Sequence, residues 1–449
     1  MGESVILPYP PDWVLTTLGE VAASGGGNIQ TGPFGSQLHA SDYVEHGIPS
    51  VMPQNIGDNR ITEKGIARIT AEDAERLSRY LLQPGDIVYS RRGDVERRAL
   101  IRPNQAGWLC GTGCLRVRLG EGPVMPEFAA YYLAHPDVRA YIVQHAVGAT
   151  MPNLNTSILS SVPFLVPPRG EQEQICEILG ALDDKIELNR RMNETLERQA
   201  RAIFKDWFVD FGPTRAKMEG REPYLAPELW NLFPATLDDD GKPMGWELSE
   251  IGKEVEAVGG ATPSTKEPAF WEGGEHHWAT PKDLSKLTSP VLLDTDRKIT
   301  DAGVKKISSG LLPAGTVLLS SRAPIGYLAI AEVPTAVNQG FIAMVCEKRL
   351  PNLFVLFWCY ENLDYIKGIS GGSTFAEISK KAFRPVPVVV PSEQVLTAYE
   401  NLVRPLYDHI VANMKETASL AQTRDLLLPK LMSGEIRLRE AEKAVEAVA

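Results

Sequence analysis

Arginines gather in one stretch of this 449-residue chain. Between Val88 and Arg118 lie seven arginines but only Asp94 and Glu96, a net charge of +5, although the whole chain carries −11. Guanidinium groups bind phosphates and the edges of bases, and a local basic surface serves this purpose even on an acidic protein. We therefore predict nucleic-acid contacts at four of these arginines, Arg91, Arg92, Arg97 and Arg98, with solvated side chains that make no contact as the alternative.

Polar residues in loops rich in glycine and proline are the second group with recognition chemistry. Hydroxyl, amide and ammonium groups bind base edges or phosphates where the backbone approaches DNA closely. An exposed loop without any contact is the alternative for each of them. The candidates are Ser36, Gln37, Thr150, Asn153, Asn155, Thr262, Ser264, Lys266, Lys282, Arg322, Ser373 and Thr374.

Catalytic and metal-binding motifs are missing from the sequence. It has no phosphate-binding loop, dinucleotide fingerprint, zinc-protease helix, serine nucleophile elbow or base-methylation motif. Cys110 and Cys114 have no second pair at zinc-site spacing, and His276-His277 has no partner motif. Asp294-x-Asp296-x-Lys298 is interpreted as a solvated turn. We therefore expect a binding protein without catalytic residues, metal or bound cofactor.

An internal duplication organises these residues. Trp13-x-Leu15-x-x-Leu18-Gly19 recurs 233 positions later with isoleucine in place of Leu18. Leu81-Leu82-x-x-Gly85-x-Ile87-x-x-Ser90 recurs after 230 positions with valine in place of Ile87, and Val162-Pro163-x-x-Val166-Pro167 recurs unchanged after 224. The first part of each copy has short apolar runs after glycine turns, which predict strands. The Val-Pro runs predict edge strands, because proline lacks the amide donor that a central strand needs. One domain-sized unit is thus used twice.

A heptad pattern follows each copy and predicts a long helix. Asn189 and Asn413 occupy the same seam position, so we expect the helices to pair with these amides near one another. An ordinary amphipathic helix packed on its own domain is the alternative. The predicted seam consists of Ile175, Leu179, Leu182, Ile186, Asn189, Leu196, Ile203 and Trp207 in the first helix and Val403, Leu406, Ile410, Asn413, Leu420, Leu427 and Leu431 in the second.

The predicted fold class is α+β, with two tandem mixed α/β domains, each followed by a long helix. Antiparallel pairing of the helices as a coiled coil needs no long return connection and gives pseudo-two-fold symmetry. Five further apolar residues of the first helix, Ile178, Leu188, Met192, Phe204 and Phe208, are expected to need a partner's helices. The predicted boundaries are 1–169 and 246–391 for the domains, 170–212 and 392–435 for the helices, 213–245 for a linker and 436–449 for a tail.

The remaining composition indicates a soluble cytoplasmic protein. No run of eighteen apolar residues is present, which predicts the absence of a membrane span. The N-terminal residues lack the basic and apolar regions of a signal peptide. The five cysteines are odd in number and irregularly spaced, so we expect idle thiols rather than disulfides.

The arrangement resembles the specificity subunit of type I restriction–modification systems over residues 5–435. The resemblance rests on Thr31–Gln37, Ser41–Tyr43 and Gly47–Pro49, on Gly259–Lys266, Trp271 and Trp278–Leu284, and on the central segments Trp207–Pro213 and Ala216–Gly220. It implies a subunit of a restriction endonuclease and adenine methyltransferase complex that is not itself catalytic. Its two target-recognition domains would each bind half of a bipartite site on double-stranded DNA.

The resemblance also implies partners and their cofactors. The paired helices would act as spacer and docking surface for two methyltransferase subunits, and restriction and translocase subunits would complete the assembly. S-adenosylmethionine, ATP and Mg²⁺ would be bound by those partners and not by this chain. A scaffold that holds two ligand-binding domains on a coiled coil is the alternative from another class, and a self-contained endonuclease is a weaker one.

Overall fold

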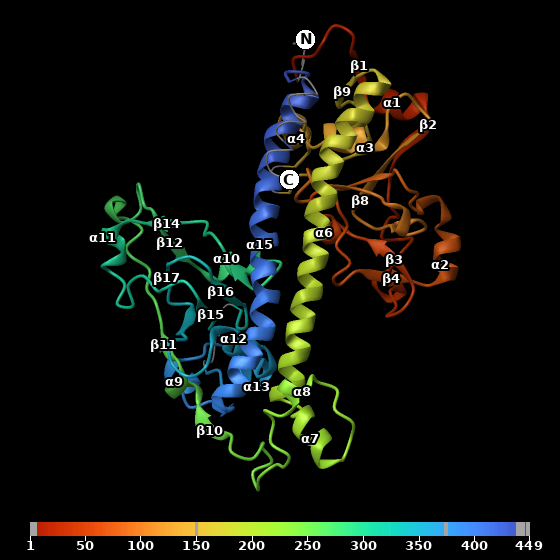
Figure 1. Ribbon diagram of the computed structural model, residues 1–449. Helices are drawn as coiled ribbons and strands as arrows, with labels where there is room; N and C mark the ends of the chain where they lie inside the picture. Colours follow the sequence, from red (N-terminus) through yellow and green to blue (C-terminus); the bar gives the residue numbers. More distant parts are fainter. Residues whose placement is uncertain (1–6, 149–150, 323, 372–375, 437–444, 446–449) are drawn as a thin grey trace. The chain divides into compact units, whose positions relative to one another are not determined.

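The computed structural model describes residues 7–148, 151–322, 324–371, 376–436 and 445. The chain forms two compact units, residues 1–185 with 419–449 and residues 186–418. The long helices α6 (Arg169–Phe208) and α15 (Glu393–Met432) each have 40 residues, and each contributes to both units (Figure 1). None of the helices in the described part of the chain is long and apolar enough to cross a membrane.

The first unit is built on two small sheets. A four-stranded antiparallel sheet has the order β2-β8-β5-β6, and a mixed three-stranded sheet has the order β4-β3-β7. The strands are β2 (Gly26–Thr31), β3 (Ile48–Val51), β4 (Ala67–Ile69), β5 (Ile87–Ser90), β6 (Arg98–Leu100), β7 (Leu109–Cys110) and β8 (Cys114–Gly120). The α-helices are α1 (Leu18–Ser24), α2 (Ala71–Arg76), α3 (Pro126–Tyr132), α4 (Pro136–His145) and α5 (Thr156–Ser160).

The second unit repeats this plan. Its sheets have the orders β11-β18-β15-β16-β13 and β14-β12-β17. The strands are β11 (Glu256–Val258), β12 (His276–Ala279), β13 (Val291–Leu292), β14 (Lys298–Ile299), β15 (Thr316–Ser320), β16 (Leu328–Ala331), β17 (Thr335–Val337) and β18 (Phe341–Val345). The α-helices are α7 (Gly212–Met218), α8 (Pro227–Trp230), α9 (Ile251–Glu254), α10 (Pro281–Ser285), α11 (Asp301–Val304), α12 (Asn352–Glu361), α13 (Leu363–Gly368) and α14 (Lys380–Phe383).

The glycines and prolines of the repeat have the same local role in both copies. Gly85 and Gly315 stand at φ +88° and +90° before β5 and β15, a left-handed conformation that glycine adopts without strain. The Val-Pro runs form β9 (Pro163–Val166) and β19 (Pro387–Val390). Each pairs in a two-stranded ribbon, β9 with β1 (Val14–Thr17) and β19 with β10 (Glu247–Glu250). The prediction of edge strands is confirmed.

Within the second unit, α6 and α15 pack antiparallel. The Asn189 side-chain amide donates to Glu416 Oε2 (2.6 Å) and Thr417 Oγ1 (3.4 Å), and the Asn413 amide donates to Asn193 Oδ1 (2.8 Å). Farther along, the Trp207 and Tyr399 rings have centroids 6.2 Å apart. Antiparallel pairing is confirmed, but the two predicted amides do not bond each other. Asn189 bonds Thr417, one helical turn after Asn413, and Asn413 bonds Asn193, one helical turn after Asn189. The two hydrogen bonds are equivalent in the repeat, because Asn189 and Asn193 correspond to Asn413 and Thr417 at the offset of 224 residues.

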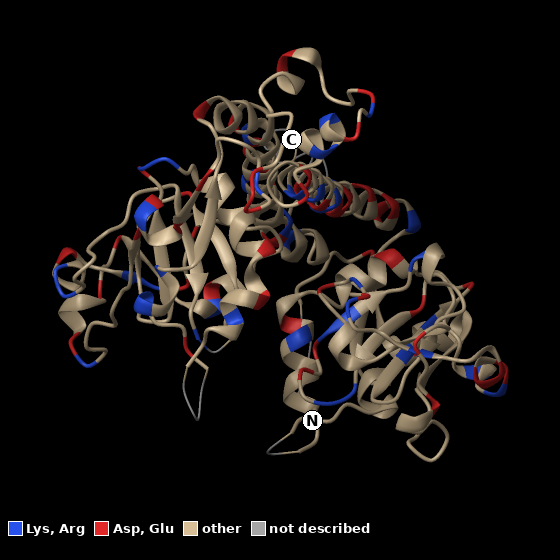
Figure 2. Ribbon diagram, turned by 90° about the horizontal axis from the view of Figure 1, so that it is seen from below, with Lys and Arg blue, Asp and Glu red and all other residues tan. Residues whose placement is uncertain are grey.

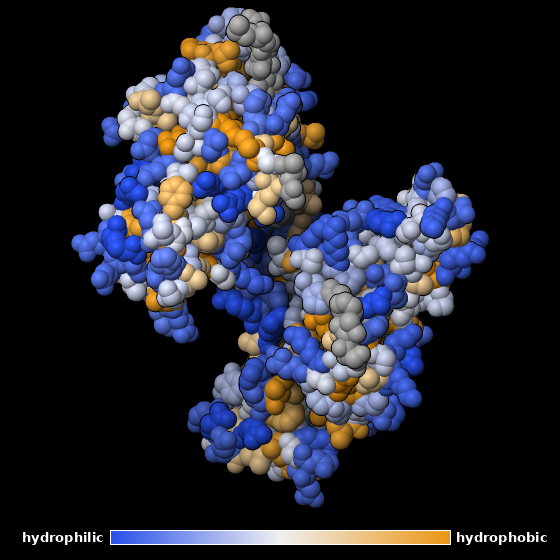
Figure 3. Space-filling model, turned by 180° about the vertical axis from the view of Figure 1, so that it is seen from behind, coloured by the Kyte–Doolittle hydropathy of each residue, from blue (hydrophilic) through white to orange (hydrophobic). Residues whose placement is uncertain are grey.

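Within the second unit the predicted seam follows this contact, because Leu196, Ile203 and Trp207 of α6 share one hydrophobic core with Val403, Leu406 and Ile410 of α15. Most of its residues are buried, and Ile186, Leu196, Ile203 and Leu406 are half-buried. The prediction that Ile178, Phe204 and Phe208 need a partner's helices is wrong, because side chains of this chain already bury all three. Leu188 remains 52% exposed and Met192 half-buried. Figure 3 shows one face of the molecule, on which hydrophilic side chains predominate and hydrophobic ones form small groups.

Candidate nucleic-acid interface

Three loops meet at the end of β5 in the first unit. The Leu154 amide donates to Arg91 O (2.8 Å) and the Gly93 amide to Pro152 O (3.1 Å), while Arg92 and Asn153 form an antiparallel bridge. The Arg91 guanidinium lies over the Phe34 ring, 5.9 Å from its centroid. The structure therefore brings Arg91, Arg92 and Asn153 together from distant parts of the sequence. Thr150 lies outside the described residues.

The loop that carries Ser36 and Gln37 is held by hydrogen bonds. Gln37 Oε1 accepts from the Phe34 amide (3.1 Å) and the Tyr80 hydroxyl (2.9 Å), and Arg76 donates to Gln37 O (2.8 Å). The Gln37 amide oxygen thus stabilises the loop, while Ser36 is exposed. Asn155 Oδ1 accepts from the Ile158 amide (2.8 Å) and caps α5, so it has a structural role of its own.

Much of the arginine cluster works inside the first unit. Arg98 is 3% exposed and donates to Ala130 O (2.9 Å). Arg116 is equally buried, bonds Asn28 and Gln30, and has its pKa lowered by burial. Arg118 pairs with both carboxylate oxygens of Asp86. We therefore remove Arg98 from the candidate contacts, whereas Arg92 and Arg97 are exposed and Arg91 half-buried.

The second unit repeats the loop frame with different side chains. The Ile378 amide donates to Ser321 O (3.0 Å), and Arg322 forms an antiparallel bridge with Glu377, as Arg92 does with Asn153. The Arg322 and Glu377 side chains form an ion pair at 3.9 Å. The backbone arrangement of these loops is thus the same in both units, but the carboxylate of Glu377 occupies the position of the Asn153 amide. Ser373 and Thr374 lie outside the described residues.

Two tryptophans hold the loop of Thr262 and Ser264. The Trp278 indole donates to Ala261 O (3.2 Å) and the Trp271 indole to Ser264 O (2.9 Å). Thr262 Oγ1 donates to Gln339 Oε1 (2.6 Å), which ties the loop to the turn before β18. Thr262, Ser264, Lys266 and Lys282 are all exposed. Sequence reasoning missed Gln339, although the Asn338-Gln339-Gly340 turn signal was available.

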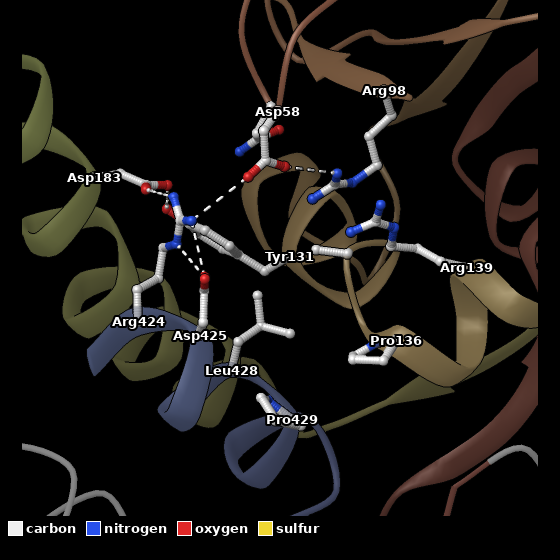
Figure 4. Close-up of a pocket in the computed structure, with 12 residues that line it drawn as sticks. Asp58, Arg98, Tyr131, Pro136, Arg139, Asp183, Arg424, Asp425, Leu428 and Pro429 are labelled. Atoms are coloured by element: carbon white, nitrogen blue, oxygen red, sulfur yellow. Dashed lines mark hydrogen bonds and ion pairs between the residues drawn. The ribbon is translucent and has the colours of Figure 1, made fainter. Parts of the chain in front are cut away.

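A charged cavity of about 260 Å³ lies in the first unit, against α15 (Figure 4). Arg424 pairs there with Asp183 (2.9 Å) and with Asp58 (3.5 Å), and Tyr131 donates to Asp183 (2.9 Å). Burial opposes the charge of Arg424, but its hydrogen bonds to Asp183 and Asp425 outweigh burial and raise its pKa. The positive charges of the arginines around the cavity are balanced by the negative charges of the aspartates. We therefore interpret these ion pairs as holding the Asp58 loop against the helices, and not as a site for an anion.

Basic and acidic segments are interspersed on both units (Figure 2), so a nucleic-acid contact would depend on local clusters of positive charge rather than on the net charge of a unit. Among the described residues no group of histidine, cysteine and carboxylate side chains is placed to hold a metal ion. The described part of the chain contains free thiols at all five cysteines. Burial raises the pKa of Cys110 and Cys346 to about 12, which keeps these thiols unreactive at neutral pH.

Comparisons with known proteins agree on one family. Residues 10–198 and 243–398 match the model of the type I restriction modification DNA specificity domain. The MjaIX specificity subunit of Methanocaldococcus jannaschii is 38% identical over 98% of this chain and 96% of its own. The HindI specificity subunit of Haemophilus influenzae is 25% identical over 86% and 95%. The S subunit structure from M. genitalium shares the fold, with a TM-score of 0.54, 16% identity and 96% and 98% coverage. The chain belongs to the family of type I restriction–modification specificity subunits.

Proposed function

We propose that the chain recognises a bipartite DNA sequence, with one half-site bound by the loop cluster of each unit. The observation that carries this proposal is the repeated frame: Arg92 opposes Asn153 in one unit and Arg322 opposes Glu377 in the other. The backbone arrangement shared by the two units positions the side chains at equivalent places, and different side chains there form different hydrogen bonds with base edges. The two halves of the target then differ in sequence.

The rest of the proposal concerns partners. The chain supplies sequence recognition, and two methyltransferase subunits bound to it transfer the methyl group from S-adenosylmethionine. Restriction subunits use ATP and Mg²⁺ in the same cytoplasmic complex. The helices α6 and α15, which continue from one unit into the other, serve as the spacer between half-sites and as the docking surface for the methyltransferase subunits.

A methyl-transfer assay tests the division of labour. We expect the purified chain to bind DNA without transferring methyl groups from S-adenosylmethionine, because the sequence carries no methylation motif. Addition of the methyltransferase subunits should produce methylation confined to one bipartite sequence. Methyl transfer by the chain alone, or methylation without sequence preference in the complex, would contradict the proposal.

Arg92→Ala tests the loop cluster of the first unit. Arg92 is exposed beside Asn153, so its loss should weaken binding to the cognate duplex by about 1–3 kcal/mol without unfolding the domain. Loss of a base contact relaxes the preference at one position of one half-site, whereas loss of a phosphate contact lowers the salt dependence of affinity.

The matched control is Arg169→Ala, because Arg169 is an exposed arginine of the same unit whose ion pair is with Glu173, four residues along the same helix (3.0 Å). Its affinity for DNA should equal that of the wild type. Titration of labelled duplexes at two salt concentrations measures both effects. If Arg92→Ala leaves affinity and salt dependence unchanged, Arg92 does not contact DNA.

A further inference from the structure

An arginine outside the predicted set lies on an aromatic platform in the second unit. The Arg297 guanidinium carbon is 3.6 Å from the centroid of the Trp271 ring and 5.4 Å from that of Trp278. The two indoles meet edge to face, 5.0 Å apart with an interplanar angle of 85°. Arg297 is exposed, so its guanidinium lies between these rings and solvent.

The backbone beneath this side chain is fixed. Arg297 O accepts from the Trp278 amide (3.2 Å) and from Thr295 Oγ1 (2.7 Å). The same two indoles donate to Ala261 O and Ser264 O in the loop that carries Thr262 and Ser264. Arg297 is thereby held in one assembly with a candidate recognition loop, although more than thirty residues separate them in the sequence.

Neighbouring carboxylates are already paired with other groups. Asp296 pairs with Lys286 (2.5 Å), and Asp294 lies 3.1 Å from His277 Nδ1 and 3.7 Å from Lys298 Nζ. Across the described residues, the Arg297 guanidinium has no hydrogen bond or ion pair, and it stacks on the two indoles. Its N–H donors are therefore available to a ligand, and stacking on the indoles fixes the plane of the guanidinium in which these donors lie.

We infer that Arg297 contacts a guanine in the half-site of the second unit, an inference that rests on the proposed function. A guanidinium presents two parallel N–H donors that match guanine O6 and N7 in the major groove. Stacking on an aromatic face restricts the rotation of the side chain and reduces the entropy lost on binding. A lysine has neither the plane nor the fork and does not replace it in this role.

Among the described residues of the first unit, this pair of indoles has no counterpart. His277 of β12 lies opposite Lys298 of β14, and Pro49 of β3 lies opposite Arg68 of β4 in the corresponding strand pair of the first unit. That register places Ala67 at the position of Arg297 and Ser50 at the position of Trp278. The contribution of Arg297 is therefore confined to one half-site, and the other half-site serves as an internal reference.

The test uses the full chain in complex with its methyltransferase subunits. The target is first mapped from methylated bases, and duplexes with each base of both half-sites replaced are then titrated. Arg297→Ala and Arg297→Lys should each weaken binding to the cognate duplex about 10- to 100-fold. Both should abolish the preference for one guanine in the second half-site and leave every preference in the first unchanged. Trp271→Phe, which keeps a ring under the guanidinium, should retain most of the guanine preference.

Lys305→Ala is the control, because Lys305 is an exposed cation of the same unit. Its sequence preferences should be those of the wild type. Absence of guanine from the second half-site, full guanine preference in Arg297→Lys, or equal weakening on all duplexes with a reduced salt dependence would overturn the inference. Failure of the wild-type complex to prefer any sequence would instead contradict the proposed function, so the two failures are distinguishable.

Discussion

Replacement of Phe204 by alanine should lower the free energy of unfolding by about 3–5 kcal/mol. Phe204 is 1% exposed, and its ring centroid lies 5.1 Å from that of Phe354, 5.2 Å from that of Phe208 and 6.0 Å from that of Tyr399. Its removal leaves a cavity among aromatic rings of α6, α12 and α15 that surrounding side chains fill only in part. The effect is large because α6 here forms part of the core of the second unit.

Chemical denaturation of the isolated chain measures this effect. Leu188→Ala on the same helix is the control, and because Leu188 is 52% exposed it should change stability by less than about 0.5 kcal/mol. The alternative from the sequence pattern was that Phe204 contacts partner helices. A Phe204→Ala chain with wild-type stability and weakened binding of methyltransferase subunits would support that alternative against the present account.

Lengthening both helices by four residues should lengthen the gap between the half-sites. The matched insertions duplicate residues 190–193 in α6 and 414–417 in α15, so each adds one turn next to the hydrogen bonds Asn189–Thr417 and Asn413–Asn193. Four residues add about 6 Å and rotate the helix about 40° beyond a full turn, so the apolar stripe is nearly preserved. At about 3.4 Å per step, we expect about two additional base pairs in the spacer with both half-sites unchanged.

The control for this experiment lengthens α6 alone. A single insertion moves the Asn193 amide away from Asn413, and each buried amide without a partner costs about 1–3 kcal/mol. We therefore expect reduced stability and weak methylation from the single insertion. Mapping of methylated bases compares the chains. An unchanged spacer in the chain with both insertions would show that the helices do not set this distance.

The repeat made much of the fold predictable from sequence. Gly85 and Gly315 mark the turns before β5 and β15 because few other residues adopt positive φ without strain. The prolines of β9 and β19 exclude those strands from the central sheets. Local constraints of this kind leave a signal at each position, and comparison of the two copies separates it from chance.

Side-chain partners from distant segments were not predictable in the same way. Arg98 and Arg116 have the sequence context of surface arginines, yet both are buried, Arg98 donating to Ala130 O and Arg116 to the side chains of Asn28 and Gln30. Arg297 gave no sequence signal because the rings on which it stacks belong to Trp271 and Trp278, 26 and 19 residues before it in the sequence. Burial and stacking depend on tertiary contacts, so a charged residue in sequence does not reveal which surface it occupies.

Exchange of one domain tests the central claim most directly. Residues 246–391 of this chain are replaced by the corresponding segment of the MjaIX specificity subunit, and the methylated bases produced by the complex are mapped. The account predicts that one half-site changes completely while the other half-site and the spacer keep their sequence and length. A target altered in both halves, or a target unchanged in both, would contradict recognition of a separate half-site by each unit.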